Sequence, residues 1–169
     1  GGDRTLTGTT INFASTLAGG TNALTITGNL DLNDAATGLT SLSVSGTSNL
    51  GANVTTTGTQ TYSDAVTLSA NVTLATTDNG NITLNDTING DYNLTISTHG
   101  TGDTTFTNAV GGTTALNNIT ISTDVLTAAA IKADGTLSVT NLNASTISGI
   151  ISQGTALALT KAGAGTLTL

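Results

Sequence analysis

The chain has 169 residues, enough for one domain, with a formal net charge of −7, and Thr, Gly, Asn and Ser make up just over half of it. Its three basic residues are too few for the basic face of a nucleic-acid-binding protein, and the absence of Cys excludes disulfides, thiol redox chemistry and Cys-ligated zinc. Because Thr, Asn, Ser and Gly are poor helix formers and Glu is absent, the composition also argues against a helical bundle.

Short segments of strict alternation recur along the chain, with an aliphatic residue at the second and fourth places and mostly Thr or Ser between. This period of two predicts strands with one buried and one solvent-exposed face. In chain order the segments are ALTIT (23–27), SLSVS (41–45), NVTLA (71–75), NLTIS (93–97), NITIS (118–122), TLSVT (136–140) and ALALT (156–160). The residues predicted to point inward are Leu24, Ile26, Leu42, Val44, Val72, Leu74, Leu94, Ile96, Ile119, Ile121, Leu137, Val139, Leu157 and Leu159.

The segments begin 18 to 30 residues apart, about 22 on average, a period typical of solenoids. A unit of two or three short strands cannot bury its apolar side alone, so we expect the units to stack as coils. The predicted fold is an all-β parallel β-helix (β-solenoid) of roughly seven or eight coils, with turn Asn side chains stacked in hydrogen-bonded ladders. An antiparallel β-sandwich is the alternative, because it also consists of short alternating strands.

Residues 1–169 are expected to form a single repeat domain, a fragment or subunit of a larger surface structure. No stretch approaches the roughly 18 apolar residues of a membrane span, and no targeting segment is recognisable, so no membrane insertion by this segment is expected.

Three segments, GTQTYSDAVTLSANVTLAT (58–76), NITLNDTINGDYNLTIST (81–98) and FTNAVGGTTALNNITIST (106–123), resemble the Thr/Gly/Asn-rich repeats of large bacterial exoproteins. These are the filamentous-haemagglutinin-like and autotransporter-passenger adhesins, and LTKAGAGTLTL (159–169) resembles the passenger-associated repeat. The resemblance covers residues 50–169, and residues 1–49 in style only. It implies a right-handed parallel β-helix on the outside of a Gram-negative cell, serving adhesion or surface structure and carrying no catalytic residues.

No catalytic constellation is predicted, and the chain is not expected to be an enzyme or to need a cofactor. His99, the single histidine, lies in the Gly-rich turn STHGTGD (97–103), where a solvated side chain is expected. A Ser–His–Asp grouping with Asp103 carries little weight, because any of 13 Ser residues would serve equally well.

Aspartate side chains in several turns could bind calcium, because this ion prefers hard oxygen ligands. The candidate ligands are Asp86 and Asp91 in NDTINGD, Asp31 and Asp34 in DLND, and Asp78. The competing interpretation is that these side chains cap turns through local hydrogen bonds to the backbone.

The leading functional hypothesis is a structural or adhesive extracellular rod or filament component of the bacterial cell surface. Its partners would be copies of itself stacked end to end, or a host-cell or matrix surface. An ice-binding protein with Thr-x-Thr columns (Thr5/Thr7, Thr25/Thr27, Thr55/Thr57) is one alternative, against which the variable repeat length counts. A carbohydrate-binding or polysaccharide-cleaving solenoid is the other alternative, although the chain has only four aromatic residues on which sugar rings could stack.

Overall fold

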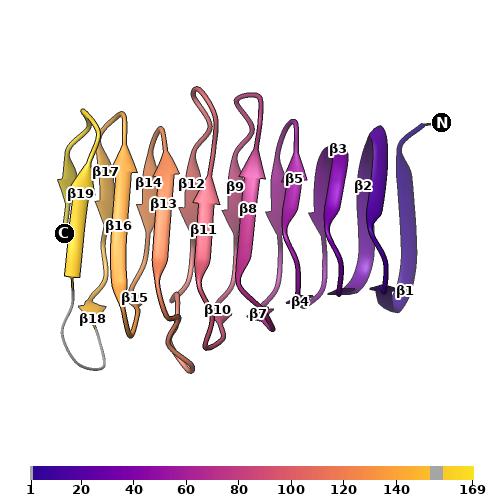
Figure 1. Cartoon of the computed structure of the whole chain (residues 1–169), viewed down its shortest axis with the longest axis horizontal. Helices are drawn as coiled ribbons and strands as arrows, with labels where there is room; N and C mark the ends of the chain where they lie inside the picture. Colours follow the sequence, from indigo (N-terminus) through magenta and orange to yellow (C-terminus); the bar gives the residue numbers. More distant parts are fainter. Residues whose placement is uncertain (1, 153–157) are drawn as a thin grey trace.

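The computed structural model describes residues 2–152 and 158–169, which form an elongated β-solenoid of about eight turns (Figure 1). Every pairing between described strands is parallel, and most strands pair with strands one coil before and one coil after them. No helix occurs among the described residues. The predicted parallel β-helix is therefore confirmed, and the antiparallel sandwich is excluded.

The strands stack in three columns, here named face 1, face 2 and face 3 in the order in which the chain visits them. Face 1 consists of residues 4–7 of β1 (Arg4–Phe13), 24–27 of β2 (Leu17–Leu32), 42–44 of β3 (Ala36–Val44), β6 (Gln60–Tyr62), β9 (Ile82–Leu84), β12 (Thr104–Phe106), β14 (Leu126–Ala128), β17 (Ser145–Ile147) and β20 (Leu167–Thr168).

Face 2 consists of residues 10–13 of β1, 29–32 of β2, β4 (Ser48–Leu50), β7 (Val66–Leu68), β10 (Ile88–Asn89), the bridging residue Val110, β15 (Ile131–Lys132) and β18 (Ile151–Ser152). Face 3 consists of residues 17–18 of β2, 36–37 of β3, β5 (Val54–Thr56), β8 (Val72–Thr76), β11 (Leu94–Ser97), β13 (Ile119–Thr123), β16 (Thr136–Asn141) and β19 (Ala158–Ala162).

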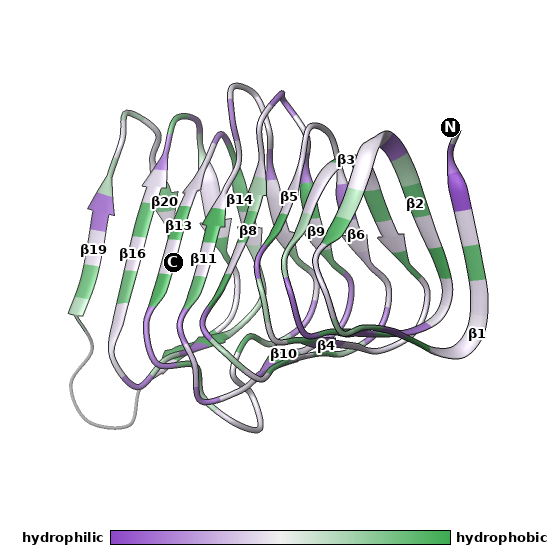
Figure 2. Ribbon diagram, turned by 45° about the vertical axis from the view of Figure 1, so that its right-hand side comes forward, coloured by the Kyte–Doolittle hydropathy of each residue, from purple (hydrophilic) through white to green (hydrophobic). Residues whose placement is uncertain are grey.

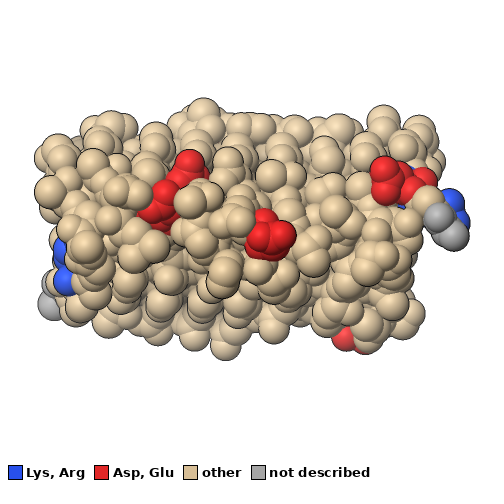
Figure 3. Space-filling model, turned by 90° about the horizontal axis from the view of Figure 1, so that it is seen from above, with Lys and Arg blue, Asp and Glu red and all other residues tan. Residues whose placement is uncertain are grey.

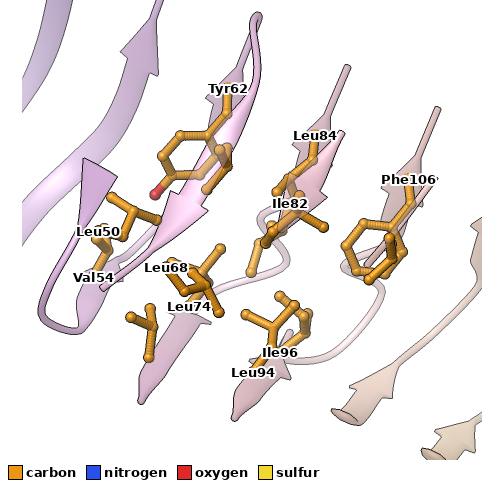
Figure 4. Packing of buried hydrophobic residues seen from close by; sticks show 14 of the residues in the cluster. Leu50, Val54, Tyr62, Leu68, Leu74, Ile82, Leu84, Leu94, Ile96 and Phe106 are labelled. Atoms are coloured by element: carbon orange, nitrogen blue, oxygen red, sulfur yellow. The ribbon is translucent and has the colours of Figure 1, made fainter. Parts of the chain in front are cut away.

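The core is a set of aliphatic columns that run along the inside of the three faces. Figure 2 shows apolar and polar bands alternating along the strands, and Figure 4 shows Leu, Ile and Val side chains of successive coils packed on one another. Twelve of the fourteen residues predicted to point inward are buried. Leu157 lies outside the described residues. Leu159 pairs in register with the inward residue Leu137, as predicted, but its side chain is 37% exposed because β19 pairs with β16 on one side only.

The alternating segments of the sequence belong to two different faces. ALTIT and SLSVS lie on face 1, whereas NVTLA and the later segments lie on face 3. The 30-residue gap between SLSVS and NVTLA therefore marks a change of face, not a long coil. Measured along face 1, successive coils contain 20, 18, 18, 22, 22, 22, 19 and 22 residues.

The corner between face 3 and face 1 is held by inward threonines that the alternation did not predict. Each donates a hydrogen bond to a turn carbonyl: Thr56 to Gly58 (2.5 Å), Thr76 to Gly80 (2.8 Å) and Thr98 to Gly102 (2.6 Å). A Cβ atom on Gly80 would lie 2.3 Å from the carbonyl carbon of Gly58, so a larger residue would force the stacked turns apart. These threonines satisfy carbonyl groups that would otherwise face an apolar interior.

A buried polar pair, Gln60 and Tyr62, lies inside the same region. The hydroxyl of Tyr62 donates to Oε1 of Gln60 (3.2 Å), and Nε2 of Gln60 donates to the Ala75 carbonyl (2.8 Å). Both side chains are 0% exposed, and burial raises the pKa of Tyr62 far above its ordinary value, so the phenol stays protonated and able to donate.

We expect Leu94→Asp to open the coils around β11. Leu94 is 0% exposed and pairs with Val72 and Ile119 on either side, so the new carboxylate would be buried without a partner, at a cost of several kcal/mol. Thr95→Ala removes an outward side chain and should cost less than about 1 kcal/mol. Urea unfolding followed by circular dichroism measures both changes. Equal losses would mean that β11 is buried on both sides.

A second prediction concerns the Tyr62 hydroxyl. Tyr62→Phe leaves Oε1 of Gln60 buried without its donor, which should lower the free energy of unfolding by about 1–3 kcal/mol. Tyr92→Phe is the matched control, because Tyr92 is 38% exposed, and its loss should stay within about 0.5 kcal/mol. The comparison uses the same urea titration. A neutral Tyr62→Phe would show that the hydrogen bond contributes nothing to stability.

Candidate functional surface

Face 1 carries an unbroken column of outward hydroxyl groups, here named the central column. Parallel pairing places its nine members in register, one per strand. They are Thr5, Thr25, Ser43, Thr61, Thr83, Thr105, Thr127, Thr146 and Thr168. None is buried, and neighbouring members are separated by the strand spacing of about 4.8 Å.

A second outward column, here named the flanking column, lies two residues after each member of the central column, within β1 and β2 and directly after the ends of the later strands. Its members are Thr7, Thr27, Ser45, Ser63, Asn85, Thr107, Ala129 and Ser148. Six of the eight carry a hydroxyl group, and no position in either column is charged. The predicted pairs Thr5/Thr7 and Thr25/Thr27 belong to these columns, whereas Thr55 lies on face 3 and Thr57 in the turn after it.

The variable coil length is absorbed outside face 1. The turn between Thr56 and Gln60 has three residues (57–59), whereas the corresponding turns 77–81 and 99–103 have five. The pairing from Thr25 to Thr168 nevertheless runs through the central column without a register shift. Corners therefore accommodate insertions while the outward hydroxyl groups stay aligned.

Face 2 presents amide and charged side chains among its outward hydroxyl groups. On its first coils Asn12, Asp31 and Asn49 occupy one outward row, and both asparagines donate to the carboxylate of Asp31, Asn49 at 2.9 Å. The hydrogen bond from Asn49, with smaller contributions from Asn33 and Asn12, holds the pKa of Asp31 below its ordinary value. Hydrogen bonds from the backbone of Ala35 and the side chain of Thr16 likewise lower the pKa of Asp34.

The corner before face 3 contains the predicted asparagine ladder. Each Oδ1 accepts a hydrogen bond from the backbone of the next coil: Asn53 from Thr73 (2.7 Å), Asn71 from Asn93 (2.9 Å), Asn93 from Asn118 (3.0 Å) and Asn118 from Thr136 (2.9 Å). These side chains link successive coils, because each oxygen is used by the backbone one coil away.

The structure does not bring the aspartates predicted as calcium ligands together in one site. Among the described residues no three His, Cys, Asp or Glu side chains lie close enough to hold a metal ion. Asp86 accepts from the backbone of Thr87 (2.6 Å), and Asp78 accepts from the side chain of Asn79 (2.9 Å). Asp91 lies exposed in the turn after β10. The contact of Asp86 is a local hydrogen bond with the backbone, as in the competing interpretation, whereas that of Asp78 is with a side chain. Calcium binding stays a prediction.

His99 and Asp103 lie in one turn, and the structure shows no hydrogen bond between their side chains. The side chain of His99 is exposed. Oδ1 of Asp103 accepts from the backbone of Val125 in the next coil (3.1 Å), so this carboxylate has a structural contact. Figure 3 shows the charged groups of one side of the rod, where acidic groups are scattered and basic groups lie near the two ends.

In comparisons with known proteins, no protein family, curated protein or solved structure matches the chain. In the described part of the chain, no helix has the length and apolar character needed to cross a membrane. The functional argument therefore depends on the faces themselves.

The lowered pKa values of Asp31 and Asp34 predict a loss of stability in acid. The folded state favours the ionised carboxylates, so their contribution is complete above the ordinary pKa, about 4, and disappears as the pH falls through the folded values. The urea midpoint of the wild type should therefore fall between pH 6 and pH 3 more steeply than that of Asp31→Asn/Asp34→Asn.

Two single variants identify the cause. Asn49→Ala removes the main donor to Asp31 and should also flatten the pH dependence. Thr67→Ala, one coil further along the same row of face 2, should keep the wild-type slope. Identical slopes for all the proteins would contradict the assignment.

Proposed function

We propose that the chain is a structural and adhesive rod on the outside of a bacterial cell. The observation that carries the proposal is the unbroken parallel register of nine strands along face 1. A continuous ladder of backbone hydrogen bonds makes a stiff, extended body whose surface repeats from coil to coil. The resemblance of residues 50–169 to repeats of bacterial exoprotein adhesins supports the same function.

The side chains also favour a structural role over catalysis. Polar groups at the corners are bonded to the backbone of neighbouring coils, as the asparagine ladder and the inward threonines illustrate. A hollow of about 330 Å³ lies beside Arg4 and is lined mainly by Leu17, Leu24, Leu39 and small residues. Arg4 is its one titratable group, which is too little for acid–base or nucleophilic chemistry.

Two basic residues occupy inward register positions. Arg4 lies at the position of the inward residue Leu24, and Lys161, whose Nζ donates to the carbonyls of Ala162 and Gly163, lies at that of the inward residue Val139. Stacking the coil of another copy on either of these coils would tend to enclose a cation, which is costly. This favours adhesion through the sides of the rod, against a host-cell or matrix surface.

The proposal predicts a stiff particle of roughly 40 Å in axial length, from eight steps of the strand spacing. Small-angle scattering and electron microscopy of the purified chain measure this length. Displayed on a non-adherent bacterium, the chain should increase attachment to host cells or matrix-coated surfaces.

Ile121→Asp, which places a charge in the core, should abolish both the rod shape and the attachment. His99→Ala and Asp103→Ala should leave both unchanged. Loss of attachment in one of these two variants, with the rod shape retained, would reveal a discrete binding site and contradict the proposal.

A further inference from the structure

The hydroxyl groups of the central column have no hydrogen-bond partner among the described residues of the protein. The corner threonines differ, because Thr56, Thr76 and Thr98 all donate to backbone carbonyls. A hydroxyl group both donates and accepts, so each exposed member of the central column can bind an external partner in either sense. Nine such groups in one register form a regular array directed at solvent.

The array is held in place before any ligand arrives. Thr is β-branched and therefore stiff at χ1, and the backbone beneath each Thr is fixed by pairing on both sides, for example Thr83 between Thr61 and Thr105. Binding to such an array requires little further ordering of the protein. A partner that contacts every hydroxyl group of the central column must itself have a repeat close to the strand spacing of about 4.8 Å.

The chemistry of face 1 selects among repeating partners. No position of the central or flanking column is charged, which argues against an ionic polymer. Sugars are commonly held on exposed aromatic rings, but the aromatic residues of face 1, Tyr62 and Phe106, point into the core and are 0% and 1% exposed (Figure 4). What remains outside is mostly hydroxyl groups, accompanied by the methyl groups of the threonines.

We propose that face 1 binds ice through the central and flanking columns. Ice is a rigid lattice in which every water both donates and accepts hydrogen bonds, and a fixed row of hydroxyl groups can replace waters at its surface. The variable coil length is no obstacle, because the corners absorb it and the central column keeps its register from Thr25 to Thr168. This property is additional to the mechanical role proposed above, and each can fail without the other.

The test compares two outward threonines in equivalent surroundings. Thr83→Tyr places a bulky ring in the middle of the central column, between Thr61 and Thr105. Thr95→Tyr places the same ring in the middle of the outward row on face 3, between Thr73 and Thr120. Both positions are half-buried, so any general effect of the ring on stability should be similar.

The measurements are thermal hysteresis at millimolar protein and partitioning into a slowly growing ice hemisphere. Wild type and Thr95→Tyr should show hysteresis and enter the ice, whereas Thr83→Tyr should enter at least about tenfold less. Circular dichroism confirms that both variants are folded, and Thr127→Tyr, on an exposed rung of the same column, replaces Thr83→Tyr if that protein unfolds.

Three results would overturn the proposal. The first is the absence of hysteresis and of partitioning in the wild type. The second is equal behaviour of the face 1 and face 3 variants. The third combines two results: the wild type has no effect on ice, and it is retained by insoluble cellulose or chitin unless Thr83→Tyr is introduced. This outcome would assign face 1 to a polysaccharide.

Discussion

Parallel pairing of each strand with the strand one coil away is the constraint on which this molecule depends. In such a stack a residue lies directly over its equivalent, as Leu94 does between Val72 and Ile119, so inward and outward positions cannot change from coil to coil. The interior is then filled by columns of inward side chains, each packed on the equivalent residue of the neighbouring coil. Leu, Ile and Val fill it along most of the rod, and the larger rings of Tyr62 and Phe106 are accommodated among them.

The same constraint decides where polar groups are placed. A turn between two faces leaves backbone carbonyls that point inward, and inward threonines satisfy them at the corner before face 1. On the outside, asparagine and aspartate oxygens accept from the backbone of the next coil, and so connect coils at corners where strand pairing is interrupted. The hydroxyl groups of the central column take no part in this arrangement, whereas in the flanking column Ser45 accepts from the backbone of Gly28 and Ser148 donates to the carbonyl of Ala128.

Much of the fold could be predicted from the sequence because burial imposes the same alternation on every coil. Leu24, Ile26, Leu94 and Ile96 all point inward as the pattern predicts. The alternation could not assign a strand to a face, because strands on faces 1 and 3 show the same alternation of aliphatic and polar residues. It also missed Thr76 and Gln60. Thr76 is buried where it donates to the turn carbonyl of Gly80, and Gln60 is buried where it donates to the carbonyl of Ala75 in β8, and neither contact depends on hydrophobicity.

The candidate surface was harder to recognise. Thr pairs such as Thr5/Thr7 were visible, but unequal repeat lengths hid the fact that one column stays aligned, because the extra residues fall in turns whose position only the paired register reveals. The calcium candidates illustrate the opposite case. Asp86 and Asp78 were conspicuous in the sequence, and their carboxylates serve neighbouring turn groups.

The equal spacing of Thr61, Thr83, Thr105 and Thr127 along the chain affects how the gene can change in length. Each interval is 22 residues, so an exchange between the DNA segments that encode two of these coils would remove or duplicate one whole turn. The new neighbours would meet in the same pairing register, with the buried side chains of each strand facing inward and a threonine facing outward. A gene of this kind can lengthen or shorten its product by one coil at a time without interrupting the surface that the coils share.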